Sequence, residues 1–219
     1  MESIKWKVES GKWKVESIKW KVESEMGVAI VKYNAGNIRS VDHALKRLGV
    51  NAEITDDPGV IQTAEKVIFP GVGEAKTTMK YLKDRGMDEL ISGLTQPVLG
   101  ICLGQQLMCR WSEESDTECI GIFDTEVKLF PDNGMKVPHM GWNRLDSVKG
   151  DLFDETLVGS YVYFVHSYYV PVCADTAAVT NYMLPFSSAM QKGNFYATQF
   201  HPEKSGDPGE KILSNFLKL

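Results

Sequence analysis

Hydrophobic and polar positions in the first half of the chain form short apolar runs separated by amphipathic segments. The apolar runs are continuous, which is typical of strands that a parallel sheet buries on both faces, and the amphipathic segments repeat with a helical period. Strands are expected at 27–31, 50–54, 67–69 and 97–102, and helices at 38–48, 77–85 and 88–94. This alternation indicates an α/β fold with a mainly parallel central sheet, flanked by helices and joined by right-handed crossovers.

After residue 111 the pattern becomes strand-rich. Apolar and alternating runs predict strands at 126–130, 161–166, 177–182, 188–191 and 195–200. Asn133-Gly134, within a turn at 131–134, is a strong hairpin signal, and 192–194 predicts a second hairpin. The second half is therefore expected to form an antiparallel extension that packs on the parallel core and is followed by an amphipathic helix at 212–217.

The first 24 residues contain a near-perfect seven-residue repeat, at 4–10, 11–17 and 18–24. Two structures fit it: a helix whose apolar stripe Gly11 interrupts, or strands joined by a turn at 9–12. Such internal identity is typical of an added leader. Residues 1–25 are therefore set aside, and the functional domain is expected to span 26–219. The alternative is an arm that binds a partner.

The composition excludes several classes of protein. A formal net charge of -5, from 24 Lys and Arg against 29 Asp and Glu, provides no basic face for nucleic acid. No apolar run approaches the roughly 20 residues of a membrane span, and no basic, apolar signal peptide stands at the front. Hydrophobic residues make up 43% of the chain, which is ordinary for a globular protein with a core. We expect a cytoplasmic protein without nucleic-acid or membrane partners.

Cysteine and histidine spacing predicts neither a metal site nor a cofactor. The chain has no C-x-x-C pair and no H-E-x-x-H motif, and its four histidines are scattered. We therefore expect neither a disulfide framework nor a zinc site, and we expect the protein to reside in a reducing compartment. The four cysteines are Cys102, Cys109, Cys119 and Cys173.

Cys102 stands at the end of an apolar strand, and an amphipathic helix is expected directly after it. Gly100 and Gly104 flank the cysteine in a Gly-x-Cys-x-Gly pattern, the thiol counterpart of the Gly-x-Ser-x-Gly nucleophile elbow. Glycines at these positions remove side chains that would collide across so tight a turn. The N-terminus of the following helix would favour the thiolate, which is the attacking species. The alternative is that Cys102 is a small buried hydrophobe.

A thiolate nucleophile needs a base, a residue that orients the base, and donors for an oxyanion. His201 follows an apolar strand, at the sheet edge where open α/β folds place their sites, and Glu203 could turn back toward it past Pro202. A loop with a solvated acid is the alternative. The oxyanion donors are expected to be the backbone N–H of Leu103 and one from the turn that contains Val72 and Gly73. That turn could also be structural only.

Three of these motifs together resemble the class I glutamine amidotransferase family. They are Gly100-Ile101-Cys102-Leu103-Gly104-Gln105-Gln106, Pro70-Gly71-Val72-Gly73 and Gln199-Phe200-His201-Pro202-Glu203-Lys204-Ser205. Three further segments are similar to the branch that serves as glutaminase subunits of imidazole glycerol phosphate synthases, and the resemblance covers about 27–219. These segments are Tyr33-Asn34-Ala35-Gly36-Asn37, Val137-Pro138-His139-Met140-Gly141-Trp142-Asn143 and Tyr163-Phe164-Val165-His166-Ser167-Tyr168.

The resemblance implies glutamine hydrolysis through a thioester. Cys102 would attack the side-chain amide, His201 would shuttle the proton, and Glu203 would orient the imidazole. Gln106 and Glu114 match substrate-holding positions, where a carboxylate suits the α-ammonium group and an amide suits polar substrate atoms. Ser167 and Tyr168 would line the same pocket. Gln105 stands where many relatives carry Met, and its side chain is expected to point away from the thiolate.

The resemblance also implies a heterodimer with a cyclase subunit that receives the ammonia and builds an imidazole ring in histidine synthesis. Six residues match positions near that interface: Asn34, Asn37, Met140, Trp142, Tyr163 and Lys204. Each has a structural alternative, because Met140 and Trp142 could be core residues, and Asn34 and Asn37 could only form a turn.

Three other functions remain open from the sequence. The chain could be the glutaminase of another synthase, such as anthranilate or aminodeoxychorismate synthase. It could be a scaffold that binds a cyclase without catalysis, or a cysteine hydrolase that uses the same elbow without a partner. The segments around Asn34 and Trp142 weigh against the first of these, and the filled triad positions weigh against the second.

Overall fold

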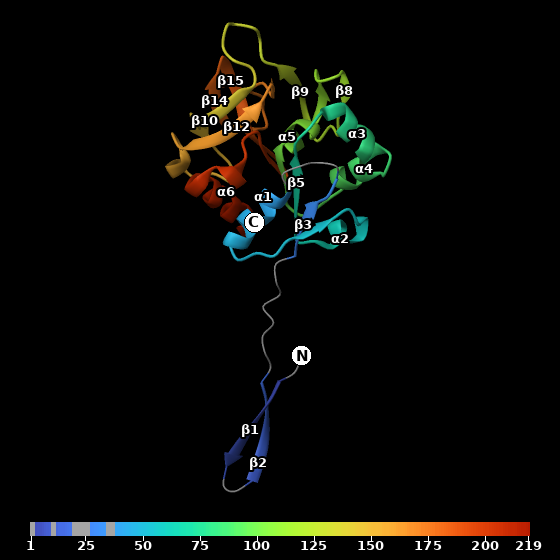
Figure 1. Cartoon of the computed structure of the whole chain (residues 1–219), viewed down its shortest axis with the longest axis vertical. Helices are drawn as coiled ribbons and strands as arrows, with labels where there is room; N and C mark the ends of the chain where they lie inside the picture. The colour runs from blue at the N-terminus through green and yellow to red at the C-terminus, as the bar shows by residue number, and fades with distance from the viewer. Residues whose placement is uncertain (1–2, 10–11, 19–26, 34–37) are drawn as a thin grey trace.

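An eight-stranded sheet forms the centre of the computed structural model (Figure 1). The structure describes residues 3–9, 12–18, 27–33 and 38–219. Five neighbouring strands are parallel, and the other three continue the sheet in antiparallel fashion. The predicted parallel core with an antiparallel extension is thus confirmed. In spatial order the strands are β11 (Ser147–Val148), β14 (Thr176–Tyr182), β15 (Leu184–Lys192), β16 (Phe195–Thr198), β6 (Val98–Cys102), β5 (Lys66–Gly71), β3 (Val28–Val31) and β4 (Glu53–Thr55).

Helices cover both faces of this sheet, which explains why its parallel strands are continuously apolar. Successive residues of a strand point to opposite faces, so Ile68 and Leu99 enter one core, and Val67 and Val98 enter the other. The first core packs against α1 (Ile38–Arg47) and α6 (Gly206–Lys218), and the second against α2 (Pro58–Thr63), α3 (Ala75–Lys83) and α4 (Met87–Ser92). None of the helices in the described ranges is long and apolar enough to cross a membrane.

Two smaller sheets complete the domain. One has the order β13 (Tyr168–Tyr169), β9 (Phe123–Leu129), β7 (Cys109–Ser112), β8 (Thr117–Glu118), and the other pairs β10 (His139–Arg144) with β12 (Tyr161–His166). The hairpin predicted around Asn133-Gly134 is wrong, because β9 pairs with β7 and β13 while β10 pairs with β12. The Tyr182 hydroxyl donates to the Lys136 carbonyl at 2.6 Å, which ties this loop to β14 instead.

Most other elements lie within a few residues of their predicted ranges. The hairpin between β15 and β16 is confirmed, whereas the strand predicted at 50–54 is β4, three residues long. Helix α2 was not predicted, and it begins directly after β4, where Asp57 accepts hydrogen bonds from Gly59 N and Val60 N. An Asp N-cap followed by Pro at the first helical position is a sequence signal for that helix. Two 3₁₀ turns are η1 (Glu155–Leu157) and η2 (Pro202–Lys204).

The N-terminal repeat contains a strand pair. β1 (Ser3–Glu9) and β2 (Lys12–Ile18) are antiparallel, in register from Ser3 opposite Ile18 to Glu9 opposite Lys12. The strand interpretation of the repeat is therefore confirmed for these ranges, and the helical one is wrong. Residues 19–26, and with them the predicted boundary between leader and domain, lie outside the described residues.

Candidate active site

The carboxyl ends of three neighbouring parallel strands meet at one edge of the sheet. β5 ends at Gly71, which lies opposite Cys102 at the end of β6. β16 lies on the other side of β6 and leads through Gln199 and Phe200 to His201. Because these strands are parallel, residues separated by up to 130 positions in the chain converge at this edge.

Cys102 has the backbone geometry of a nucleophile elbow. Its φ of 56° and ψ of -107° are a strained conformation for a residue with a side chain. A Cβ on Gly104 would collide with the carbonyl oxygen of Phe69, and one on Gly100 would lie 2.9 Å from the Met108 sulfur. Glycine at both positions therefore allows the close approach that the turn needs, as the sequence predicts.

The helix predicted directly after the cysteine is present, and it is short. α5 (Leu103–Leu107) has five residues, and β7 begins at Cys109. The macrodipole grows with the number of aligned peptide units, so this helix contributes less to a thiolate than a full-length one. Hydrogen bonds from neighbouring side chains become correspondingly more important.

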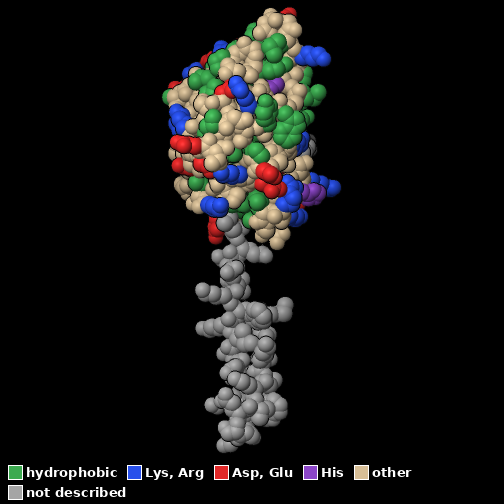
Figure 2. All heavy atoms as spheres, turned by 90° about the vertical axis from the view of Figure 1, so that its left-hand side faces the viewer, with side chains coloured by type: hydrophobic (Ala, Val, Ile, Leu, Met, Phe, Trp, Pro, Cys, Tyr) green, Lys and Arg blue, Asp and Glu red, His purple; other side chains and the backbone are tan. Residues whose placement is uncertain are grey.

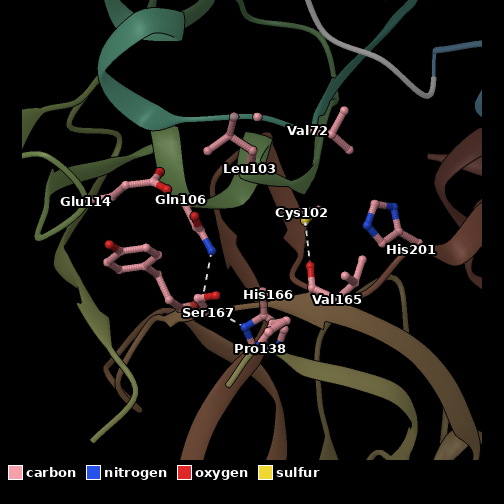
Figure 3. A pocket seen from close by; sticks show the side chains of 12 residues that line it. Val72, Cys102, Leu103, Gln106, Glu114, Pro138, Val165, His166, Ser167 and His201 are labelled. Atoms are coloured by element: carbon pink, nitrogen blue, oxygen red, sulfur yellow. Dashed lines mark hydrogen bonds between the residues drawn. The ribbon is translucent and has the colours of Figure 1, made fainter. Parts of the chain in front are cut away.

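His201 and Glu203 form a buried pair. The Nδ1–H of His201 donates to Oε1 of Glu203 at 2.9 Å, and both side chains are shielded from solvent. The interpretation of Glu203 as a solvated acid is therefore wrong. The His201 backbone N–H donates to the Tyr163 carbonyl at 2.9 Å, and the Ser205 hydroxyl donates to the His201 carbonyl at 2.6 Å. These bonds fix the ring so that one edge faces Cys102 (Figure 3).

The electrostatics of His201 favour its protonated form. Burial lowers the pKa of the imidazole, but Cys102 and the Glu203 carboxylate together raise it to about 9. The Nε2 atom is buried, and the Cys102 side chain is the group that interacts with it, so it is placed to exchange a proton with the sulfur. This pairing of an imidazolium with a cysteine is typical of thiol nucleophiles that are activated by histidine.

A cavity of about 400 Å³ opens in front of these groups. Figure 3 shows Cys102, Gln106, Glu114 and His201 around it. Among the described residues, no group of three or more His, Cys, Asp and Glu side chains is placed to hold a metal ion. All predicted oxyanion and substrate residues line the cavity, together with Pro138, Val165 and His166, which were not predicted; the predicted set is Val72, Gly73, Leu103, Gln106, Glu114, Ser167 and Tyr168.

The polar groups of the cavity differ in what they can bind. Glu114 accepts a hydrogen bond from Ala75 N at 2.7 Å, at the start of α3. Burial raises the pKa of this carboxyl, the Ala75 amide lowers it, and nearby Glu74 raises it again. Gln106 donates from Nε2 to the Tyr168 carbonyl at 3.0 Å, which leaves its Oε1 for a ligand. A carboxylate and an amide oxygen together suit an ammonium group.

A hydrogen bond from Tyr33 fixes the start of the turn at 70–73, which is predicted to supply an oxyanion donor. The Tyr33 hydroxyl donates to the Pro70 carbonyl at 2.5 Å, one residue before Gly71. Leu103 is the first residue of α5, so its N–H is not used within the helix. Val72 and Leu103 approach the cysteine from different elements in Figure 3. Their role as oxyanion donors remains a prediction.

Besides Val165, sequence reasoning missed a residue whose side chain lies next to the nucleophile. Gln199 is fully buried, and its Nε2 lies 3.7 Å from the Cys102 sulfur. Strand register could have found it, because Thr198 pairs with Ile101 and the next residue of each strand is Gln199 and Cys102. By contrast, Gln105 donates from Nε2 to the Ser187 carbonyl at 3.0 Å and does not line the cavity, as predicted.

The predicted interface residues that the structure describes gather on one surface. Met140 and Trp142 are 67% and 57% exposed on β10, so their alternative as core residues is wrong. Trp142 pairs with Tyr163 of β12, and the Lys204 ammonium lies 5.9 Å from the centre of the Tyr163 ring. Exposed hydrophobic side chains are visible on this side of the molecule in Figure 2. The remaining two, Asn34 and Asn37, lie outside the described residues.

Comparison with known proteins agrees with this geometry. Residues 29–219 match the family described as glutamine amidotransferase class-I. The imidazole glycerol phosphate synthase subunit HisH of Bacteroides fragilis is 64% identical over 196 residues, which are 89% of this chain and all of that protein. The HisH subunit of Escherichia coli K12 is 46% identical, also over 89% of this chain and all of that protein.

Among solved structures, a glutamine amidotransferase superposes with a TM-score of 0.67, at 21% identity over 88% of this chain and 98% of that one, which shows the shared fold. The chain therefore belongs to the class I glutamine amidotransferase family and, within it, to the HisH subunits of imidazole glycerol phosphate synthase.

Proposed function

We propose that the chain hydrolyses glutamine and passes the ammonia to the cyclase subunit of an imidazole glycerol phosphate synthase in histidine biosynthesis. The observation that carries this proposal is a single cavity lined by the strained Cys102, by Glu114 and by His201, whose imidazole is bonded to the buried Glu203 behind it. The identity to HisH subunits supports this synthase over anthranilate or aminodeoxychorismate synthase.

Glutamine binds with its α-ammonium group against Glu114 and its side-chain amide at Cys102. The Gln106 Oε1 accepts from the same ammonium group, while Ser167 and Tyr168 close the side of the cavity. Glu114 and Cys102 lie on different elements at opposite ends of the cavity in Figure 3, which suits a substrate with charged and reactive ends. Fixing both ends places the amide carbon next to the sulfur.

The first step forms a thioester. The Cys102 thiolate attacks the amide carbon, and the carbonyl electron pair moves to the oxygen, where the N–H of Leu103 and one N–H from the turn that contains Val72 and Gly73 stabilise the negative charge. The C–N bond then breaks, and His201 gives its proton to the departing nitrogen, so that ammonia leaves. Thioester formation removes the negative charge of the sulfur, and the pKa of His201 falls because that charge helped to raise it. The imidazolium thus becomes a stronger acid when the amine needs a proton.

The second step uses the neutral imidazole. His201 accepts a proton from water, the hydroxide attacks the thioester, and glutamate leaves as the thiolate is restored. Glu203 keeps Nδ1 protonated through its 2.9 Å hydrogen bond, so Nε2 remains the reactive atom. The triad therefore returns to its starting charges after each turnover.

The cyclase binds over the β10–β12 surface. Met140, Trp142, Tyr163 and Lys204 form the described part of this interface, and Asn34 and Asn37 are assigned to it from the sequence. β12 links the surface to the chemistry directly, because Tyr163 bonds the backbone of His201 and the Val165 carbonyl lies 3.9 Å from the Cys102 sulfur. Ammonia released at Cys102 therefore leaves beside the partner-binding strand.

The four cysteines support a cytoplasmic location. Cys102, Cys109, Cys119 and Cys173 carry free thiols, and three of them are buried. Such thiols, including a catalytic one, persist in a reducing compartment.

The deciding experiment measures glutamate release from glutamine by the chain alone, with a cognate cyclase, and with the cyclase and its nucleotide ligand. Strong stimulation by the liganded cyclase would support the assignment. Activity that the cyclase does not change would reopen the choice of synthase. Complementation of a histidine auxotroph, but not of tryptophan or folate auxotrophs, would distinguish the three candidate pathways.

A further inference from the structure

Besides the His201 imidazole, the side chain of Gln199 places a nitrogen donor next to the nucleophile, 3.7 Å from the Cys102 sulfur. Its backbone is fixed by a 2.9 Å hydrogen bond from its N–H to the Ser188 carbonyl. Its side chain is fully buried between Cys102 and Gln106. A buried amide in such a place is oriented by its hydrogen-bond partners.

The orientation of the Gln199 amide follows from the Tyr168 carbonyl, to which it is linked through two hydrogen bonds and the side chain of Gln106. The Tyr168 carbonyl can only accept, so the Gln106 atom 3.0 Å from it is the nitrogen Nε2. The same nitrogen lies 2.9 Å from Gln199, so the Gln199 atom that faces it is the acceptor Oε1. The other Gln199 atom, 3.7 Å from the Cys102 sulfur, is therefore the NH₂ group.

The sulfur thus has two neighbours of opposite character. The Val165 carbonyl, 3.9 Å away, can only accept a hydrogen bond from a thiol. The Gln199 NH₂ can only donate, and a thiolate is the better acceptor. The short α5 helix provides a small dipole, so a directed donor has more influence on the charge of the sulfur.

We propose that Gln199 is a catalytic residue of this glutaminase: its side-chain NH₂ donates to the Cys102 sulfur, favours the thiolate and aims it at the substrate amide. The inference rests on the proposed function. Gln106 and the Tyr168 carbonyl act as positioning groups, because they fix the amide with its nitrogen toward the sulfur.

The test follows alkylation of Cys102 by iodoacetamide in the full chain from pH 5 to 10, with peptide mass spectrometry to separate Cys102 from the other cysteines. In Gln199→Met the midpoint of the pH–rate profile is expected to move to higher pH by about 1 unit, a tenfold lower rate on the acid side. In Gln199→Glu the Gln106 bond is retained, but a carboxylate oxygen faces the sulfur, so a larger shift is expected.

Gln105→Met is the matched control, since it replaces a buried amide of equal size that donates to Ser187 and not to the sulfur. Its profile is expected to follow that of the unmodified chain. An unchanged midpoint in folded Gln199→Met and Gln199→Glu would overturn the inference. Glutamate release by the unmodified chain with its cyclase tests the proposed function separately. If no glutamate were released, the proposed function would fail, while the shift of the alkylation profile in the Gln199 variants would still be measurable.

Discussion

His139 and His166 share a hydrogen bond of 3.0 Å between Nδ1 of the first and Nε2 of the second. The Nδ1 of His166 lies 2.7 Å from the Tyr168 carbonyl, so it carries a proton. The Asn143 amide nitrogen donates to the Asn181 carbonyl and lies 3.3 Å from Nε2 of His139, so this Nε2 accepts and His139 donates from Nδ1 to Nε2 of His166. The chain of bonds accommodates both rings only as neutral imidazoles. It connects β10 to the carbonyl that also fixes Gln106.

This pair predicts a loss of stability in mild acid. Burial lowers the pKa of His139 to about 4 and of His166 to about 3, against about 6.5 in an unfolded chain. Below pH 6.5 the unfolded chain therefore binds protons that the folded chain does not. The free energy of unfolding should fall by about 1.4 kcal/mol per pH unit for each ring down to about pH 4. Urea unfolding at pH 7, 6 and 5 measures this slope.

His201 acts in a different pH window. Its raised pKa of about 9 stabilises the folded chain fully below about pH 6.5, and that contribution is lost as the pH rises through 9. The pH dependence of the histidine ring signals in NMR spectra distinguishes His201 from His139 and His166, because the pKa is raised in the first and lowered in the other two. Titration of His139 or His166 near pH 6.5 in the folded chain would contradict the neutral pair.

Replacing the nucleophile should abolish hydrolysis without unfolding the chain. Cys102→Ala removes the attacking sulfur, so glutamate release in the presence of the cyclase should fall by about 10⁴-fold or more. Cys119→Ala is the control, because that thiol is also buried but does not line the cavity. Retained turnover in Cys102→Ala would contradict the thioester mechanism.

Glu114 should determine the affinity for glutamine more than the rate of the chemical step. Glu114→Gln keeps an oxygen for the Ala75 N–H but removes the charge that faces the α-ammonium group. A hydrogen bond to a charged group contributes about 1.5–3 kcal/mol, so KM should rise by about 10- to 100-fold with a smaller change in kcat. Glu113→Gln is the control, since Glu113 bonds Leu129 N outside the cavity. An equal effect of both substitutions would rule out this role.

The parallel half of the fold could be predicted because its signals are local. Continuous apolar runs at Val28–Val31 and Val98–Cys102 leave no polar face for solvent, and the glycines around Cys102 have a direct steric reason. The convergence of Cys102, His201 and Glu203 also follows, once the strands are known to be parallel. These inferences need only the period of the pattern and the rules of strand connection.

The strand pairing of the second half could not be predicted in the same way. Asn133-Gly134 indicates a local turn, but the partners of β9 and β10 are set by long-range packing and by the bond from Tyr182 to the loop. The Gln199 contact and the neutral histidine pair depend on side-chain geometry across separate strands. Sequence spacing carries no information on such distances.

The repeated N-terminal segment is predicted to be dispensable. β1 and β2 pair with each other, and the described part of the eight-stranded sheet contains neither. Removal of residues 1–25 should therefore change glutamate release and cyclase affinity by less than about twofold. The measurement compares the two chains side by side in the complex. A large loss of cyclase affinity would instead identify the segment as a partner-binding arm.

Trp142 should contribute strongly to cyclase binding. Its ring is 57% exposed and packs edge-on against Tyr163 at 6.0 Å, so it presents a rigid apolar surface. Tryptophans in such positions often contribute ~2 kcal/mol or more to an interface, so Trp142→Ala should raise the Kd for the cyclase by about 30-fold. Trp111→Ala on β7, outside the two-stranded β10–β12 sheet, is the tryptophan control. Equal Kd values for the two variants in calorimetric titrations would exclude the β10–β12 surface as the cyclase interface. If the partner buries Trp142, its replacement by Ala must remove contacts from the complex that the Trp111 replacement does not.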